Sequence, residues 1–196
     1  MTAESPGIID SLTVGVSCGE HVVVIDRAPV QNFAGVLGDA NPLYRDSRAA
    51  RDAGFADVPA PPTYPFVMLH WGIRDELLDE HGIEPVPSNP FTGVADQLGH
   101  VGLVMAQMIE ELGPGVVLHA EQGFEYHRTP VVGDVLRGTS EIVDVHTKSS
   151  RHGVLTFVVI ETVWTDVATS ARVVTTRFTA VHQPRNNTDS KEGSSS

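Results

Sequence analysis

Leu155-Thr156-Phe157-Val158-Val159-Ile160-Glu161-Thr162-Val163-Trp164 is a run dominated by β-branched and aromatic residues, which predicts a β-strand. Apolar residues occupy both alternating sets of positions in it, and this pattern favours a sheet that is covered on each face at its centre. Similar runs lie on either side, separated by turn residues. We therefore predict an antiparallel meander of four long strands, over residues 115–128, 133–147, 154–166 and 171–183.

The residues before this predicted sheet are mostly helical in pattern. Thr63 as a cap, Pro65 in the first turn and Gly82 after the end predict a long helix over residues 63–81. The first part of this segment is apolar nearly all round, as in a buried helix. The remaining predicted elements are a strand at 20–26, short helices at 29–38 and 47–53, a proline-rich loop at 84–93, and a segment at 94–112 that is more helical than not.

Composition limits the class of protein. The 196 residues, with 41% hydrophobic and 19% charged, are enough for one sizeable core and too few for two. The net charge of −12 opposes the field that a nucleic-acid or anionic-membrane binder needs. Cys18 is the single cysteine and forms no internal disulfide, which fits a reducing compartment. The first residues lack the features of a signal peptide, so we expect a cytoplasmic protein.

Three segments carry a resemblance to a known family. They are Gly38-Asp39-Ala40-Asn41-Pro42-Leu43-Tyr44-Arg45-Asp46, then Ala60-Pro61-Pro62-Thr63-Tyr64, and later His119-Ala120-Glu121-Gln122-Gly123-Phe124-Glu125-Tyr126-His127-Arg128. The first two resemble the MaoC-like hydratase/dehydratase family, whose motif reads Gly-Asp-x-Asn-Pro-Leu-His-x-Asp before the central helix. The third resembles the second strand of the fatty-acid-synthase-like dehydratase branch of that family.

The resemblance spans roughly residues 20–183 and implies an α+β hot-dog fold. In that fold a long central helix, here assigned to 63–81, is wrapped by an antiparallel sheet. Residues 84–112 then look like a helical or loop insertion after the central helix. Residues 1–19 form an N-terminal extension in this reading, and the polar residues 184–196 form a disordered tail.

The family adds water to, or removes it from, an acyl thioester, with an (R)-3-hydroxyacyl product in hydration. The chemistry needs a carboxylate and an imidazole together, and a backbone N–H that polarises the thioester carbonyl. Asp39 matches the family's aspartate, but Tyr44 stands where the family has histidine. A gap-free count places Pro62, which has no N–H, at the oxyanion glycine. A shift of one residue would offer the N–H of Thr63 instead.

These departures resemble the degenerate half of heteromeric or fused relatives. We expect a subunit that shapes the substrate tunnel of an enoyl-CoA hydratase in lipid metabolism, paired as a hot-dog dimer with a His-bearing partner. Two other readings stay open: a homo-oligomeric hydratase that uses Asp39 with His70 or Tyr44, and a non-enzymatic acyl-thioester binding protein. The expected substrate-binding residues are Asn41, Pro62, Thr63, Tyr64, Phe66, Met68 and Trp71.

The expected ligand is a coenzyme A thioester, with no further cofactor and no metal. An acidic carrier protein would meet a repulsive field here. His119 and His127, eight residues apart on one predicted strand, are expected on the same face, but they lack further metal ligands nearby in sequence. Candidates for the coenzyme A phosphates are Arg45, Arg48, Arg51, Arg128, Lys148 and Arg151. Asp39 and Asn41 also suit simple turn roles. Gly15-Val16-Ser17-Cys18-Gly19 matches a hydrolase elbow, but a strand follows it instead of a helix.

Overall fold

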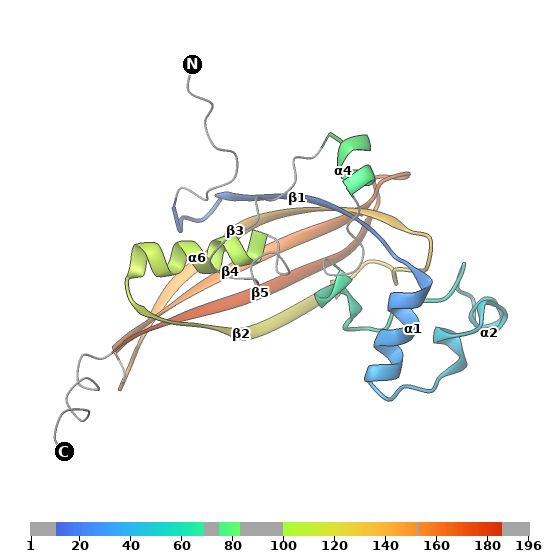
Figure 1. The fold of residues 1–196 in the computed structure, drawn as a ribbon, viewed down its shortest axis with the longest axis horizontal. Coiled ribbons are helices and arrows are strands. Elements are labelled where there is room, and N and C mark those ends of the chain that lie inside the picture. The colour runs from blue at the N-terminus through green and yellow to red at the C-terminus, as the bar shows by residue number, and fades with distance from the viewer. Residues whose placement is uncertain (1–10, 69–74, 83–99, 152, 186–196) are drawn as a thin grey trace.

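One antiparallel sheet of five strands forms the centre of the molecule, with helix α6 across one face (Figure 1). The computed structural model describes residues 11–68, 75–82, 100–151 and 153–185. The strands are β1 Ser17–Val24, β2 Gly115–Tyr126, β3 Val135–Ser150, β4 Gly153–Asp166 and β5 Arg172–Pro184. The described α-helices are α1 Arg27–Val36, α2 Ser47–Asp52, α4 Asp75–Glu80 and α6 His100–Leu112, and two 3₁₀ turns are η1 Pro42–Tyr44 and η2 Tyr64–Phe66.

The strand order is β1-β3-β4-β5-β2, which is the topology of the expected hot-dog fold. All four predicted long strands are present, but the prediction that they run as one meander is wrong for β2. Strand β1 occupies the edge of β3 from Ser17 to Val24, so β2 pairs with β5 at the opposite side of the sheet. The residues between β2 and β3 therefore connect the two sides of the sheet and do not form a hairpin.

The helix that packs against the sheet is α6. Val104 and Met108, one helical turn apart, are fully buried in a cluster whose strand members are Cys18, Ile142, Val158, Ile160, Phe178 and Ala180. The assignment of residues 100–112 to an insertion is therefore wrong, because their apolar face is part of the core. Residues 84–99 lie outside the described residues.

The predicted helix over 63–81 is not the wrapped helix. Its start forms the 3₁₀ turn η2, and α4 forms near its end; residues 69–74 lie outside the described residues. Tyr64 and Met68 are fully buried against Leu136, Trp164 and Val174. This second cluster also takes in Val30 of α1. Two different segments therefore cover successive parts of the sheet, where the sequence predicted one long helix.

Gly138 shows how closely the second cluster is packed. A Cβ atom at this position would lie 2.7–2.8 Å from three carbons of the Trp164 ring. Real Cβ atoms essentially never approach that closely. Gly138 of β3 lies opposite Trp164 of β4. The indole ring of Trp164 therefore fits in this place only because Gly138 has no side chain.

The opposite face of the sheet is polar over much of its area. A groove of about 530 Å³ runs over it, lined by residues of four strands that include His146, Phe157 and Arg177. Among the described residues the apolar clusters contain none of these three side chains, so no described segment supplies the predicted cover on this face, and cover from another chain stays a prediction. Leu12 and Val16 pack against the α6 cluster, so this part of the predicted N-terminal extension belongs to the domain. No described helix is long and apolar enough to cross a membrane.

Candidate active site

The loop after α1 holds Asp39 in a turn. The Asp39 N–H donates to the carbonyl of Ala34 at 2.9 Å, and its Oδ1 accepts from the Asn41 N–H at 2.9 Å. Asn41 Oδ1 in turn accepts from the Leu43 N–H at 3.1 Å and caps η1. Both side chains therefore organise the loop, as Asx turns do. Asp39 is half-buried and Asn41 is exposed.

Tyr44, at the position of the family's histidine, lies close enough to Asp39 for that charge to act on its phenol. Burial, and after it the Asp39 carboxylate, raises the pKa of the Tyr44 phenol above its ordinary value. Because that value is already 10.0, the phenol stays protonated at neutral pH. It is able to donate a hydrogen bond but does not serve as a general base there.

Pro62 presents an acceptor at the position that the motif assigns to a donor. Its carbonyl accepts a hydrogen bond from the Tyr126 hydroxyl at the end of β2. Burial raises the pKa of Tyr126 to about 12, so this hydroxyl also keeps its proton. Thr63, the alternative donor, is exposed and occupies the N-cap position of η2 without a side-chain capping hydrogen bond.

The turn η2 joins the Asp39 region to the edge strand β2. The Tyr64 ring meets Phe33 of α1 edge-on, with centroids 5.6 Å apart. The Phe66 ring stacks on the His119 imidazole at 5.4 Å, and this imidazole stacks on Phe178 at 4.3 Å. The two ends of η2 therefore make separate ring contacts, Tyr64 with α1 and Phe66 with His119 of β2.

Several predicted site residues have other roles. Tyr64 and Met68 are fully buried in the core, so they do not form a surface for an acyl chain in this structure. Phe66, with 38% of its surface exposed, keeps an available ring. His70 and Trp71 lie outside the described residues.

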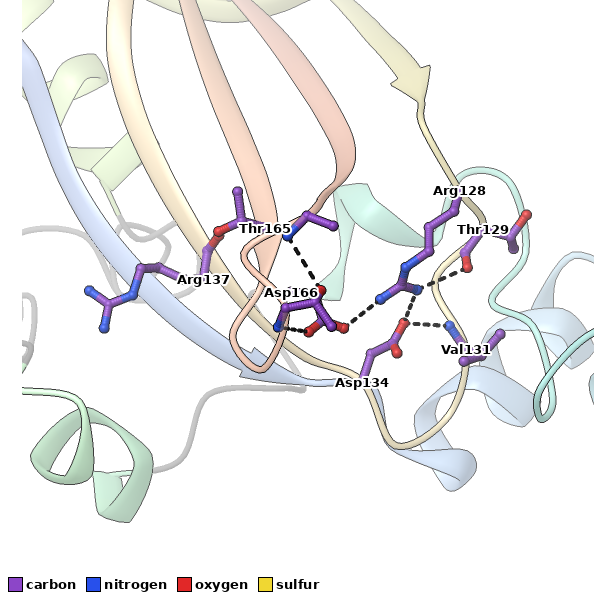
Figure 2. Close-up of polar contacts among 9 residues, drawn as sticks. Arg128, Thr129, Val131, Asp134, Arg137, Thr165 and Asp166 are labelled. Atoms are coloured by element: carbon purple, nitrogen blue, oxygen red, sulfur yellow. Dashed lines mark hydrogen bonds and ion pairs between the residues drawn. The ribbon is translucent and has the colours of Figure 1, made fainter.

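Arg128 is not available for a phosphate, because two carboxylates hold it. Its Nη1 donates to Asp134 Oδ2 at 2.5 Å and its Nη2 donates to Asp166 Oδ2 at 2.7 Å (Figure 2). Asp134 Oδ2 also accepts from the Val131 N–H at 2.9 Å. This clamp ties the end of β2 to the turns before β3 and after β4. Of the other predicted cations, Arg45, Arg48 and Arg51 remain exposed, and Lys148 lies 4.9 Å from the Phe157 ring centre.

His119 and His127 do not share a face of β2, contrary to the prediction from their spacing. Strand β2 has a register shift between His119 and Glu121, and it ends at Tyr126. His127 contacts Thr175, which is an odd number of residues from Phe178 on β5 and so lies on the other face. Among the described residues no three His, Cys, Asp or Glu side chains form a group suited to a metal ion.

Tyr126 and Gln122 were missed as functional candidates in the sequence. Both lie inside the segment 119–128 that carries the family resemblance, so a signal was present. Tyr126 contacts Pro62, which is far away in the sequence, and Gln122 lies opposite Phe178 of β5.

Comparisons with known proteins agree with this geometry. The family model of the FAS1-like dehydratase domain region matches residues 12–176. The chain is also similar to UPF0336 proteins. The UPF0336 protein of Thermobifida fusca is 29% identical over 121 residues, which cover 62% of this chain and 61% of the relative. The UPF0336 protein of Clavibacter michiganensis is 32% identical over 124 residues, which cover 63% of this chain and 64% of the relative. The match thus spans less than two thirds of each relative's length.

Solved structures share the fold. The ChsH1-ChsH2 complex from Mycobacterium tuberculosis superposes with a TM-score of 0.61 at 21% identity, over 86% of this chain and 85% of that chain. The C-terminally truncated HadBC (3R-hydroxyacyl-ACP dehydratase) complex from the same organism gives 0.53 at 18% identity, over 83% and 93%. With five antiparallel strands around α6 and a family model that matches most of its length, the chain has the expected hot-dog fold and belongs to the FAS1-like dehydratase domain family.

Proposed function

We propose that this chain is the tunnel-forming subunit of a heteromeric enoyl-thioester hydratase whose acid–base pair lies on a partner. The observation that carries the proposal is that residue 44 is a tyrosine whose phenol keeps its proton. A protonated phenol lies near Asp39, where the family motif has an imidazole, and the Asp39 carboxylate contributes to keeping it protonated. Asp39 therefore has no base beside it in the described part of its loop.

The second departure supports the same function. Pro62 supplies no N–H, and its carbonyl already accepts the Tyr126 hydroxyl. Losing an oxyanion donor typically lowers the rate by about 10²–10³, and losing the acid–base group lowers it by about 10²–10⁴. Even a partial combination of the two losses leaves the isolated chain close to inactive.

The edge of β2 that no described strand pairs with is the surface on which a partner would pair. The strand runs over 12 residues, and its other edge pairs with β5. Val116 and Leu118 are 51% and 49% exposed on it. Long apolar edge strands act as templates for another strand. Two of the similar solved structures are complexes of two named chains, which favours a second hot-dog subunit as the partner.

A coenzyme A thioester is the substrate that the charge distribution favours. The overall charge of −12 repels anions, so phosphates need a local group of cations. Arg45, Arg48 and Arg51 are exposed in and beside α2, and Arg45 Nη2 lies 3.5 Å from the Asp39 carbonyl oxygen. This group would hold the phosphates close to the Asp39 loop.

Hydration assays test the proposal directly. The purified chain, given crotonyl-CoA and a longer enoyl-CoA, should show negligible hydration, and activity should appear on mixing with a His-bearing homologue. Brisk turnover by the pure chain that is lost in Asp39→Asn would establish the homo-oligomeric hydratase instead. Thioester binding without activity in any mixture would point to a binding protein. The double change Tyr44→His with Pro62→Gly should give the isolated chain measurable activity; a folded but inactive double variant would contradict the mapped site.

A further inference from the structure

A β-bulge on the edge strand β2 brings two polar side chains to the same face. The ladder with β5 pairs His119 with Ala180 and Gln122 with Phe178, and its register shifts between His119 and Glu121. Ala180 and Phe178 are two residues apart on β5 and are both buried in the α6 cluster. His119 and Gln122 therefore share the inner face, although a regular strand would place residues three apart on opposite faces. Bulges are frequent beside active sites, where they redirect a side chain in this way.

The imidazole of His119 is held in one orientation but remains accessible. Phe66 and Phe178 stack on it, with interplanar angles of 9° and 11°. Its Nε2 lies 3.0 Å from the carbonyl oxygen of Glu121. A carbonyl is an acceptor, so Nε2 is assigned as the donor and Nδ1 as the acceptor of the neutral ring. The residue is exposed, so a ligand is able to reach it.

The carboxamide of Gln122 is underused. Its Oε1 is buried and has no hydrogen-bond donor among the described residues. Its Nε2 donates to the Gly123 carbonyl at 3.5 Å, the outer limit of a hydrogen bond. Buried polar atoms are nearly always paired, so an orphan acceptor calls for a partner that the described residues do not supply. Gln122 lies opposite Phe178, the same ring that His119 contacts.

We propose that His119 and Gln122 bind the secondary amides of the pantetheine arm of an acyl thioester. The arm carries two amide N–H groups, and the bulge brings two acceptors to one face: the Nδ1 of His119 and, on rotation of its buried carboxamide toward the ligand, the Oε1 of Gln122. Phe66 packs against the imidazole and connects this site to η2, the turn that follows Pro62. The inference rests on the proposed function in one respect, that the ligand is an acyl thioester. It does not depend on which subunit carries the chemistry.

Calorimetric titration of the full chain, alone and mixed with a His-bearing homologue, tests this site. The probes are pantetheine, crotonyl-CoA and a carrier protein bearing phosphopantetheine. Gln122→Met keeps the side-chain length without the acceptor, and His119→Phe keeps the ring stack without the nitrogen. Each variant should bind pantetheine and crotonyl-CoA about threefold to tenfold more weakly, as expected for one lost hydrogen bond. Glu125→Gln, on the outer face of the same strand, is the matched control and should bind like the natural chain.

The outcomes separate the two proposals. If crotonyl-CoA binds and is hydrated by the mixture, but both variants bind it as tightly as Glu125→Gln, the amide site is refuted and the proposed function stands. If no thioester binds to the chain or to the mixture, both fail. If the variants bind both crotonyl-CoA and the carrier protein more weakly, the site recognises the pantetheine arm that the two ligands share. If they bind only one of the two more weakly, that one is the ligand of the site. The NMR resonance of the Gln122 side-chain NH₂ group should shift when pantetheine is added. An unchanged resonance would show that only water fills the site and would also refute the amide site.

Discussion

Arg128→Met removes the guanidinium that pairs with both Asp134 and Asp166 at the end of the sheet. Both carboxylates are largely buried, with 12% and 15% of their side chains exposed, and the arginine is 36% exposed. Removing one partner of a buried ion pair costs about 3–5 kcal/mol. Because the guanidinium is partly screened by water, we expect a smaller loss, about 2–3 kcal/mol in the free energy of unfolding.

Urea unfolding followed by far-UV circular dichroism measures this loss. For a domain of this size about 1 kcal/mol lowers the melting temperature by about 2–4 °C, so Arg128→Met should melt about 4–12 °C lower. Arg177→Met is the matched control, because it also removes an arginine paired with a carboxylate, Glu161, at 2.6 Å. Arg177 is 54% exposed, so its loss should cost less than about 1 kcal/mol.

A second variant distinguishes the cost of leaving two carboxylates without a cation from the cost of lost packing around Arg128. Adding Asp134→Asn and Asp166→Asn to Arg128→Met removes the uncompensated carboxylates, so part of the lost stability should return. Equal losses for Arg128→Met and Arg177→Met would refute the assigned role of the clamp. So would a triple variant that is less stable than Arg128→Met alone.

Three further predictions concern single side chains. Burial, and to a lesser extent the charge of Glu141, raises the pKa of the Cys18 thiol from 9.0 to about 11. The folded chain should therefore hold about 100-fold less thiolate at Cys18 and react with iodoacetamide only after urea unfolds it. Rapid labelling of the folded chain would contradict this prediction. Gly138→Ala should destabilise the fold by about 1–3 kcal/mol in urea titration, whereas Gly35→Ala, with open space around its Cβ, should not. The hydrogen bond from the Val58 N–H is the main cause that lowers the pKa of Asp57 in the folded chain. The stability that ionised Asp57 contributes is therefore complete above the unfolded pKa near 4 and is lost as the pH falls through the folded pKa. Asp57→Asn should make the free energy of unfolding less dependent on pH in this acid range, and an unchanged pH dependence would refute the prediction.

Local chemistry made several parts of the molecule predictable. Alternation and β-branching predicted all four long strands, because side-chain period is a property of the strand itself. The motif around Asp39 identified the family, and it placed Tyr44 at the position of the family's histidine. Both conclusions depend on residues within a few positions of one another, which is the range over which backbone geometry is set.

The choice of central helix depended on competition between segments. Residues 63–81 and 94–112 both carry apolar faces, and periodicity does not indicate which of them packs on the sheet. The structure places Val104 and Met108 of α6 there. It places Tyr64 in a separate cluster beside Trp164.

The amino-acid sequence by itself determined the strands, the family and the absence of an imidazole and an amide donor at the expected motif positions. Tertiary structure alone decided that β2 pairs with β5, that Tyr126 reaches Pro62, and that a bulge turns Gln122 to the face of His119. The physical reason is that pairing register and packing are settled by residues far apart in the chain. A shift of one residue in register moves a side chain to the other face of the sheet, and no local pattern in β2 records that shift.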